Sequence, residues 1–275
     1  MLKYRILTIA VLIPLVWYLL FNVSISYKRG VILLLMLWAW WEWRGLALPL
    51  SLPKQVLSFS AMGVLAVVSH HPTAQIYILG LGTLFWLFVA PCWLVKRWQP
   101  SAFLNLIIGS GLIVSLFSAI AYLVHKSPAF LLASMALIWV SDIMAYVTGR
   151  LLGRHKLAPE ISPGKTWEGA LGGILFSALY TSIIFLYFGA SLNVHTTNLT
   201  LGQYPLFWLF LFSILLAAYG IIGDLFESLL KRQAGKKDSG TLLPGHGGIL
   251  DRIDALFPVL PMIALLCVLG IIHVS

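Results

Sequence analysis

Residues 206–223 read LFWLFLFSILLAAYGIIG, and residues 224–254, which follow directly, read DLFESLLKRQAGKKDSGTLLPGHGGILDRID. The first segment is an unbroken apolar run of nearly the length, about 20 residues, that a helix needs to cross a membrane. The second segment holds five of the nine acidic residues of the chain, together with several lysines and arginines. Ionisable groups gathered at the end of an apolar span predict a functional site at a membrane surface.

The composition of the whole chain indicates a polytopic membrane protein and excludes a soluble domain. Of its 275 residues, 60% are hydrophobic and 10% are charged, and the mean hydropathy is +0.94. In a soluble protein the net charge of +9 would suggest a nucleic-acid partner. Here we expect no nucleic acid, because basic residues accumulate on the cytoplasmic loops of membrane proteins, where they can also meet anionic lipid head groups or phosphates.

The apolar segments predict an all-α fold, with one integral membrane domain over residues 1–275 and about nine transmembrane helices. The candidate spans are residues 6–21, 30–48, 56–69, 76–95, 103–124, 129–149, 169–189, 206–223 and 255–273. Residues 1–130 are interpreted as scaffold spans that face lipid, with tryptophans near their ends as an aromatic belt and Glu42 as their one acid. Residues 131–275 are interpreted as the catalytic half.

The distribution of positive charge predicts the orientation of the chain. When the N-terminus is placed inside, all of the 18 Lys and Arg residues except Lys28, Arg29 and Lys126 fall on the inner side. The positive-inside rule therefore predicts a cytoplasmic N-terminus in the inner membrane of the cell. It also places the two polar loops of the catalytic half, residues 150–168 and 224–254, on the cytoplasmic side together with the site.

The helix that continues from residues 206–223 carries four polar side chains on one face: Asp224, Glu227, Ser228 and Lys231. Their spacing of i, i+3, i+4 and i+7 places them along a single helical stripe. One interpretation is a carboxylate face that holds a divalent cation. The alternative is that Asp224 and Lys231 are residues at the end of a span that form mutual salt bridges.

A glycine-rich, basic loop follows this helix and leads to a second pair of acids, Asp251 and Asp254. Backbone N–H groups together with Lys and Arg are the groups that bind phosphate oxygens. The two carboxylate pairs can converge on one or two Mg²⁺ ions, which prefer oxygen ligands and share the phosphates of the substrate. Within the loop, His246 either contacts a phosphate or only forms hydrogen bonds to the loop itself.

Two residues outside this segment are further candidates. Asp142 lies late in the predicted span 129–149, and an acid at that depth predicts either a functional group or a buried structural acid. Lys165, in the loop after this span, is a cation suited to a phosphate.

A longer pattern covers residues 228–254: Ser228-x2-Lys231-Arg232-x4-Lys237-Asp238-x-Gly240-x2-Leu243-Pro244-x-His246-Gly247-Gly248-x2-Asp251-Arg252-x-Asp254. This pattern resembles the signature of the phosphatidate cytidylyltransferase family, also called CDP-diacylglycerol synthases. Residues 155–169, HKLAPEISPGKTWEG, resemble the other cytoplasmic loop of that family. The resemblance implies an enzyme of phospholipid biosynthesis that condenses CTP with phosphatidic acid and releases pyrophosphate.

The resemblance also implies the cofactor and the residue roles. It implies Mg²⁺, as one or two ions of which the second could be monovalent, bound by Asp224 and Asp251, which with Lys231 are the predicted catalytic residues. The residues predicted to bind substrate or to orient the groups that do are Asp142, Lys165, Ser228, Arg232, Lys237, Asp238, His246, Gly247, Gly248, Arg252 and Asp254. A homodimer is a further implication of the resemblance alone.

Two other functions remain open from the residues. The same chemistry would suit a related nucleotidyl or phosphoryl transferase that acts on another lipid phosphate. An anion transporter would also use a basic inner face and a membrane-embedded acid such as Asp142. The absence of a visible internal repeat in the sequence argues against the inverted-repeat architecture of many transporters.

Overall fold

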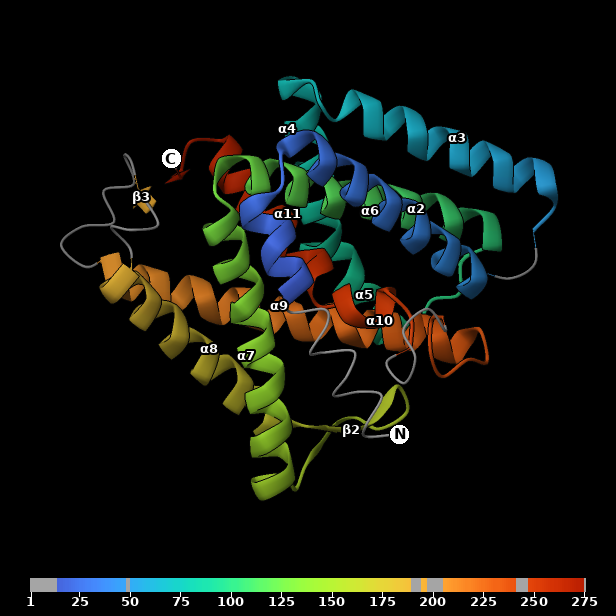
Figure 1. The fold of residues 1–275 in the computed structure, drawn as a ribbon. Helices are drawn as coiled ribbons and strands as arrows, with labels where there is room; N and C mark the ends of the chain where they lie inside the picture. The colour runs from blue at the N-terminus through green and yellow to red at the C-terminus, as the bar shows by residue number, and fades with distance from the viewer. Residues whose placement is uncertain (1–13, 48–49, 189–193, 197–204, 241–246, 275) are drawn as a thin grey trace.

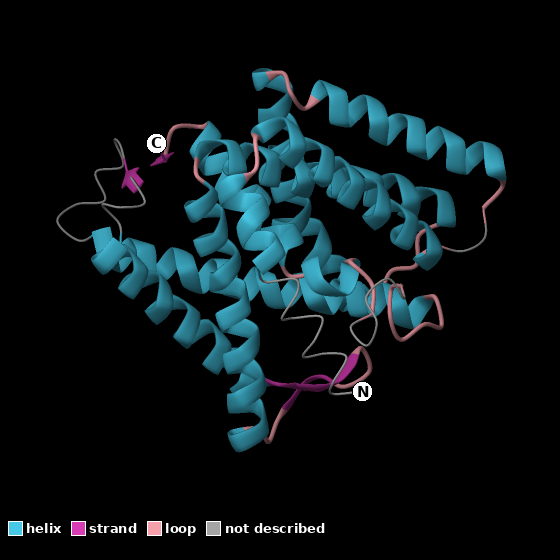
Figure 2. Ribbon diagram, viewed as in Figure 1, coloured by secondary structure: helices cyan, strands magenta, loops and turns pink. Residues whose placement is uncertain are grey.

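The computed structural model describes residues 14–47, 50–188, 194–196, 205–240 and 247–274, and these residues are almost entirely helical (Figure 1, Figure 2). After a helix over residues 14–22, the helices are α2 (Ile25–Leu46), α3 (Leu52–Val68), α4 (Pro72–Leu84), the π-helical η1 (Phe85–Val89), α5 (Ala90–Lys96), α6 (Ala102–Lys126), α7 (Pro128–Leu152), α8 (Trp167–Phe188), α9 (Pro205–Gln233), α10 (Leu250–Ile253) and α11 (Leu256–Val268). The helical fold class predicted from the sequence is confirmed.

Several helices begin where their sequence favours a beginning. Proline is the first residue of α4, α7 and α9, where its missing N–H leaves no helical hydrogen bond unmade. The side chains of Ser101 and Ser127 accept hydrogen bonds from the first turns of α6 and α7 at Leu104 N and Phe130 N. These local signals fix the start of the helices that carry the core and one wall of the site.

Five helices of the described part are long and apolar enough to cross a membrane: Pro72–Lys96, Ala102–Lys126, Pro128–Leu152, Trp167–Phe188 and Leu206–Gln233. They establish a multi-pass membrane protein, whereas the count of nine spans and the orientation of the N-terminus stay predictions. Half of the predicted span 6–21, residues 6–13, lies outside the described residues. The apolar run 206–223 does not end as a separate span but continues to Gln233 as one helix, α9.

Two small sheets accompany the helices. Strands β1 (Lys156–Ala158) and β2 (Ser162–Thr166) form an antiparallel hairpin within the loop between α7 and α8, with Lys156 opposite Thr166. Strands β3 (Val194–Thr196) and β4 (Ile272–Val274) also pair antiparallel. The hairpin matters for function because it carries Lys165 back to the helices.

The core is centred on α11, which packs against α4, α6 and α9 (Figure 1). Its residues Val259, Leu260 and Ala264 have no exposed surface. The buried side chains from both halves of the chain belong to one hydrophobic cluster, so the scaffold and the catalytic half share a core.

The predicted aromatic belt is wrong for several tryptophans. Trp40, Trp43, Trp86 and Trp93 are buried in the protein, and all except Trp40 contact rings of the core, such as Phe226 of α9. Aromatic rings suit a packed interior as well as a membrane interface, because both bury large apolar surfaces. The first half of the chain is therefore not simply a lipid-facing scaffold.

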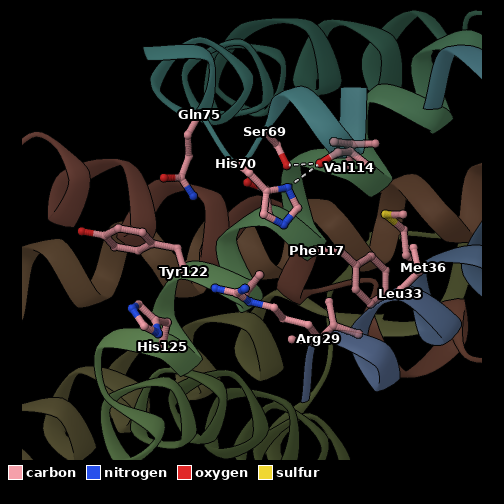
Figure 3. A pocket seen from close by; sticks show the side chains of 14 residues that line it. Arg29, Leu33, Met36, Ser69, His70, Gln75, Val114, Phe117, Tyr122 and His125 are labelled. Carbon is pink, nitrogen blue, oxygen red and sulfur yellow. Dashed lines mark hydrogen bonds between the residues drawn. The ribbon is translucent and has the colours of Figure 1, made fainter. Parts of the chain in front are cut away.

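A pocket with a volume of about 230 Å³ opens between the start of α2, the connection from α3 to α4 and the end of α6. Figure 3 shows the side chains of Arg29, His70 and Tyr122 around it. None of the residues that line the pocket is an aspartate or glutamate. The pocket is therefore not lined by the acidic residues of the predicted site.

Candidate active site

Asp251 on α10 lies at the centre of the predicted site. Its Oδ2 atom accepts hydrogen bonds from Ser239 N at 3.0 Å, Ser239 Oγ at 2.9 Å and Gly248 N at 2.8 Å. Its Oδ1 atom accepts one from Lys231 Nζ at 2.6 Å. Burial would raise the pKa of Asp251, but Lys231 and the backbone N–H groups outweigh it and lower the pKa below its usual value. The carboxylate is therefore held ionised.

The backbone beside Asp251 requires glycine at position 247. Gly247 has a φ of +80°, a conformation that other residues rarely adopt. A Cβ atom at this position would lie 2.7 Å from Asp251 Oδ2. Gly247 thus allows the loop to approach the carboxylate closely.

Lys231 joins the acids of two helices. Its Nζ atom lies 2.5 Å from Glu227 Oε2 on α9 and 2.6 Å from Asp251 Oδ1 on α10. Glu227 is buried, and the side chains of Lys231 and Asp251 are only 13% and 7% exposed. The structure therefore brings the two predicted carboxylate pairs together, with a lysine between them. Neither oxygen of Glu227 accepts a well-aligned hydrogen bond, so Lys231 is its ionic partner.

Asp224, one turn earlier on α9, is paired with the hairpin. Lys165 Nζ on β2 lies 2.6 Å from Asp224 Oδ2, and Ser228 Oγ donates a hydrogen bond of 3.3 Å to Asp224 Oδ1. Asp142 on α7 is exposed and interacts electrostatically with Asp224 and Lys165. Both predicted polar loops and α7 therefore meet at this end of α9.

Asp254 completes the group of acids. Burial, together with the charges of Asp224 and Glu227, raises the pKa of Asp254 well above its usual value. Its carboxylate Oδ1 accepts a hydrogen bond of 2.8 Å from Ala255 N. The close approach depends on Gly223, where a Cβ atom would lie 2.5 Å from the backbone oxygen of Asp254. A larger residue there would separate α9 from the start of α11.

The remaining predicted residues lie around this cluster. Arg232 is exposed, and its Nε donates a hydrogen bond of 3.3 Å to the backbone oxygen of Ile161. Lys237 and Asp238 are exposed on the turn after α9, and Arg252 is exposed on α10. Gly248 is buried and donates to Asp251, as given above. His246 lies outside the described residues.

Glu42 was misplaced by the sequence-based interpretation. It is 4% exposed and does not face lipid, because its carboxylate binds the loop that carries Asp251. Ser239 Oγ lies 3.0 Å from Glu42 Oε2 and 2.9 Å from Asp251 Oδ2, so the serine stands between the two acids. One signal was available in the sequence, since an acid within an apolar run is itself a functional candidate.

The donor set is compatible with Mg²⁺ if the substrate supplies part of the coordination. Within the residues that the structure describes, no three His, Cys, Asp or Glu side chains are grouped to hold a metal ion by themselves. Mg²⁺ commonly uses one or two carboxylates together with substrate phosphates and water. Asp224 and Asp251 offer such carboxylates, and each is now paired with a lysine whose place a cation could take.

Comparison with known proteins identifies the family to which this chain is similar. A model of the cytidylyltransferase family matches residues 3–269. A phosphatidate cytidylyltransferase of Pseudomonas aeruginosa is 34% identical over 283 residues, which cover 97% of each chain. The phosphatidate cytidylyltransferases of Haemophilus influenzae and Staphylococcus epidermidis are 44% and 43% identical over 131 and 140 residues.

These last two matches cover 48% and 50% of this chain, and they span about half the length of each relative, 43% and 49%. The match to the family model, by contrast, extends over nearly all of the sequence. The chain belongs to the cytidylyltransferase family.

Proposed function

We propose that this protein is a phosphatidate cytidylyltransferase, which converts CTP and phosphatidic acid into CDP-diacylglycerol and pyrophosphate. Membership of the cytidylyltransferase family and the full-length similarity to the Pseudomonas protein of that name support the proposal. The observation that carries it is the buried contact of Lys231 with both Glu227 and Asp251, beside the Asp224–Lys165 pair. Carboxylates and lysines of this kind are suited to a nucleotide bound with its cation.

In the proposed reaction a phosphate oxygen of phosphatidic acid attacks the α-phosphorus of CTP. A new P–O bond forms there, the bond from the α-phosphorus to the bridging oxygen of the β-phosphate breaks, and pyrophosphate leaves with the bonding electrons. Phosphatidic acid arrives as an anion, so the reaction needs no obligatory general base. The barrier lies mainly in bringing two anions together in the correct alignment.

The side chains of this site address that barrier through their charge. Lys165 and Lys231 place positive charge among the acids, where it can stabilise phosphate oxygens as charge shifts during the transfer. Arg232, Lys237 and Arg252 are exposed around the cluster, where incoming phosphates meet them first. We assign Asp238 and Asp254 to orienting these cations or the water molecules around a metal.

We assign metal binding to Asp224 and Asp251, as one or two Mg²⁺ ions or as Mg²⁺ with a monovalent partner. When bound, Mg²⁺ would neutralise the charge of the phosphates and hold the reacting groups in alignment. The four hydrogen bonds to Asp251 orient this carboxylate in advance, so that little of its freedom remains to be lost on binding.

We place the site at the cytoplasmic face of the inner membrane, with the N-terminus inside and about nine spans. The charge bias of the loops supports this orientation. At that surface CTP arrives from the cytoplasm, and the lipid reaches the site by lateral diffusion within the inner leaflet.

The test uses the purified full chain in mixed micelles of detergent and phosphatidic acid. We expect pyrophosphate release that requires CTP, phosphatidic acid and Mg²⁺ together, with CDP-diacylglycerol as the lipid product. If the protein turns over isoprenoid phosphates but not phosphatidic acid, the proposed lipid substrate is wrong. If it uses another nucleotide but not CTP, the proposed nucleotide is wrong. Absence of pyrophosphate release under every combination would exclude a nucleotidyltransferase and favour the transporter alternative.

A further inference from the structure

The carboxylate of Glu42 is bound by four donors, of which three come from the segment around Asp251. Glu42 Oε1 accepts hydrogen bonds from Trp38 Nε1 at 3.2 Å and Ile249 N at 3.0 Å. Glu42 Oε2 accepts a hydrogen bond from Leu250 N at 3.0 Å, and it also lies 3.0 Å from Ser239 Oγ, whose one proton is shared between Glu42 and Asp251. Three of these partners, Ser239, Ile249 and Leu250, lie 197, 207 and 208 positions away in the sequence, so this contact joins the first half of the chain to the second.

Glu42 is held on a rigid part of α2. Trp40 donates a hydrogen bond of 3.1 Å to Ser110 Oγ on α6, and Trp43 donates one of 3.1 Å to Asn105 Oδ1 on the same helix. Both tryptophans are buried. The part of α2 that carries Glu42 is therefore anchored to α6 on both sides of this residue.

Gly240 and Gly248 both approach this carboxylate closely. A Cβ atom at Gly240 would lie 2.4 Å from Glu42 Oε1, and one at Gly248 would lie 2.3 Å from Glu42 Oε2. Distances this short are not tolerated between non-bonded atoms. The absence of side chains at Gly240 and Gly248 lets the backbone reach the carboxylate from both sides.

The same backbone also serves Asp251. Of three consecutive N–H groups, Gly248 N donates to Asp251, whereas Ile249 N and Leu250 N donate to Glu42. Ser239 makes the parallel connection, because its Oγ lies within hydrogen-bond distance of both carboxylates. A displacement of residues 248–250 away from Glu42 would therefore change the donors that hold Asp251.

We propose that Glu42 is a positioning residue for the transfer reaction, which fixes Ser239 and the backbone of residues 248–250 and thereby the carboxylate of Asp251. The catalytic consequence rests on the proposed function, in which Asp251 binds the metal. Glu42 itself contacts no substrate. It acts as an anchor in the scaffold half for the metal-binding half.

Two substitutions at Glu42 separate hydrogen bonding from packing. In Glu42→Gln the size is kept, but the amide NH₂ must face either Ile249 N–H and Trp38 Nε1–H or Leu250 N–H, so a donor meets a donor in both orientations. In Glu42→Asp both acceptor oxygens are kept on a side chain that is one methylene shorter. If Glu42 acts by accepting hydrogen bonds from these N–H groups, Glu42→Asp should be more active than Glu42→Gln. If Glu42 only fills space, Glu42→Gln should be the more active variant.

The kinetic test measures pyrophosphate release per folded molecule of each variant. We expect kcat of Glu42→Gln to fall roughly tenfold or more and its half-saturating Mg²⁺ concentration to rise several-fold, as for groups that orient metal ligands. Glu42→Asp should lie between Glu42→Gln and the wild type. The control is Lys236→Gln, which removes a hydrogen bond from the same loop to Gly45 O without touching Asp251, and it should keep its Mg²⁺ dependence.

A second measurement does not depend on activity. Hydrogen exchange of the full chain should show faster exchange of the peptide containing Ile249 and Leu250 in Glu42→Gln than in the wild type or in Lys236→Gln. If the wild type lacks activity, the proposed function fails while the exchange experiment still tests the anchor. Unchanged exchange, an unchanged Mg²⁺ titration, or Glu42→Gln more active than Glu42→Asp would overturn the positioning role.

Discussion

Replacement of Lys231 by methionine tests whether the buried contact between α9 and α10 holds the site together. The side chains of Lys231, Glu227 and Asp251 are 13%, 5% and 7% exposed, so their interaction is weakly screened by solvent. Lys231→Met changes the total formal charge of these three side chains from −1 to −2. It leaves the two carboxylates without their shared cation. Removal of one partner from a buried pair typically costs about 3–5 kcal/mol.

The lower end of that range applies because Asp251 keeps its three other hydrogen-bond donors. At roughly 2–4 °C for each kcal/mol in a chain of this size, about 3 kcal/mol lowers the unfolding temperature by roughly 6–12 °C. The assay is thermal unfolding in detergent, followed by tryptophan fluorescence. Adding Glu227→Gln to Lys231→Met returns the charge to −1 and should recover part of the loss. Unfolding of Lys231→Met within about 2 °C of the wild type, which corresponds to a cost of about 1 kcal/mol or less, would refute the reasoning.

Three further predictions follow from the same site. Asp251→Asn should abolish pyrophosphate release while the protein still inserts and elutes as a single species, and retained turnover would remove Asp251 from metal binding. The pKa of Asp251 is lowered in the folded state, so its stabilising contribution is present above about pH 4 and disappears as the pH falls through the lower folded value. The unfolding temperature of the wild type should therefore fall more steeply on acidification than that of Asp251→Asn, and parallel curves would contradict this. Gly247→Ala should lose more activity than Gly235→Ala, because both positions have positive φ but only at Gly247 would the new methyl group meet Asp251; equal losses would show that backbone strain alone matters.

Much of the site follows from local spacing in the sequence. The stripe of Asp224, Glu227, Ser228 and Lys231 was readable because helical periodicity relates residues three and four positions apart. The structure confirms the continuous helix and the contacts within this stripe. The expectation that it meets Asp251 is also met, although the lysine between the two acids was not foreseen as their link.

The long-range partners could not be predicted in this way. Glu42 and Lys165 lie on separate elements, and nothing in periodicity tells which distant backbone or acid each will meet. Trp40 and Trp43 show the same limit, because an aromatic residue near the end of a span fits both a lipid interface and a packed core. Tertiary packing decides between these outcomes, and it places the anchor of the site in the half of the chain whose one acidic residue is Glu42 itself.

The two lysine–aspartate contacts at this site also affect the protein between turnovers. Lys165 and Lys231 serve as built-in counterions for Asp224 and Asp251, so the acids remain compensated when neither nucleotide nor magnesium is present. In the empty enzyme these two acids therefore keep a positively charged partner. Chelation of magnesium should then abolish the activity reversibly and leave the unfolding temperature of the protein almost unchanged.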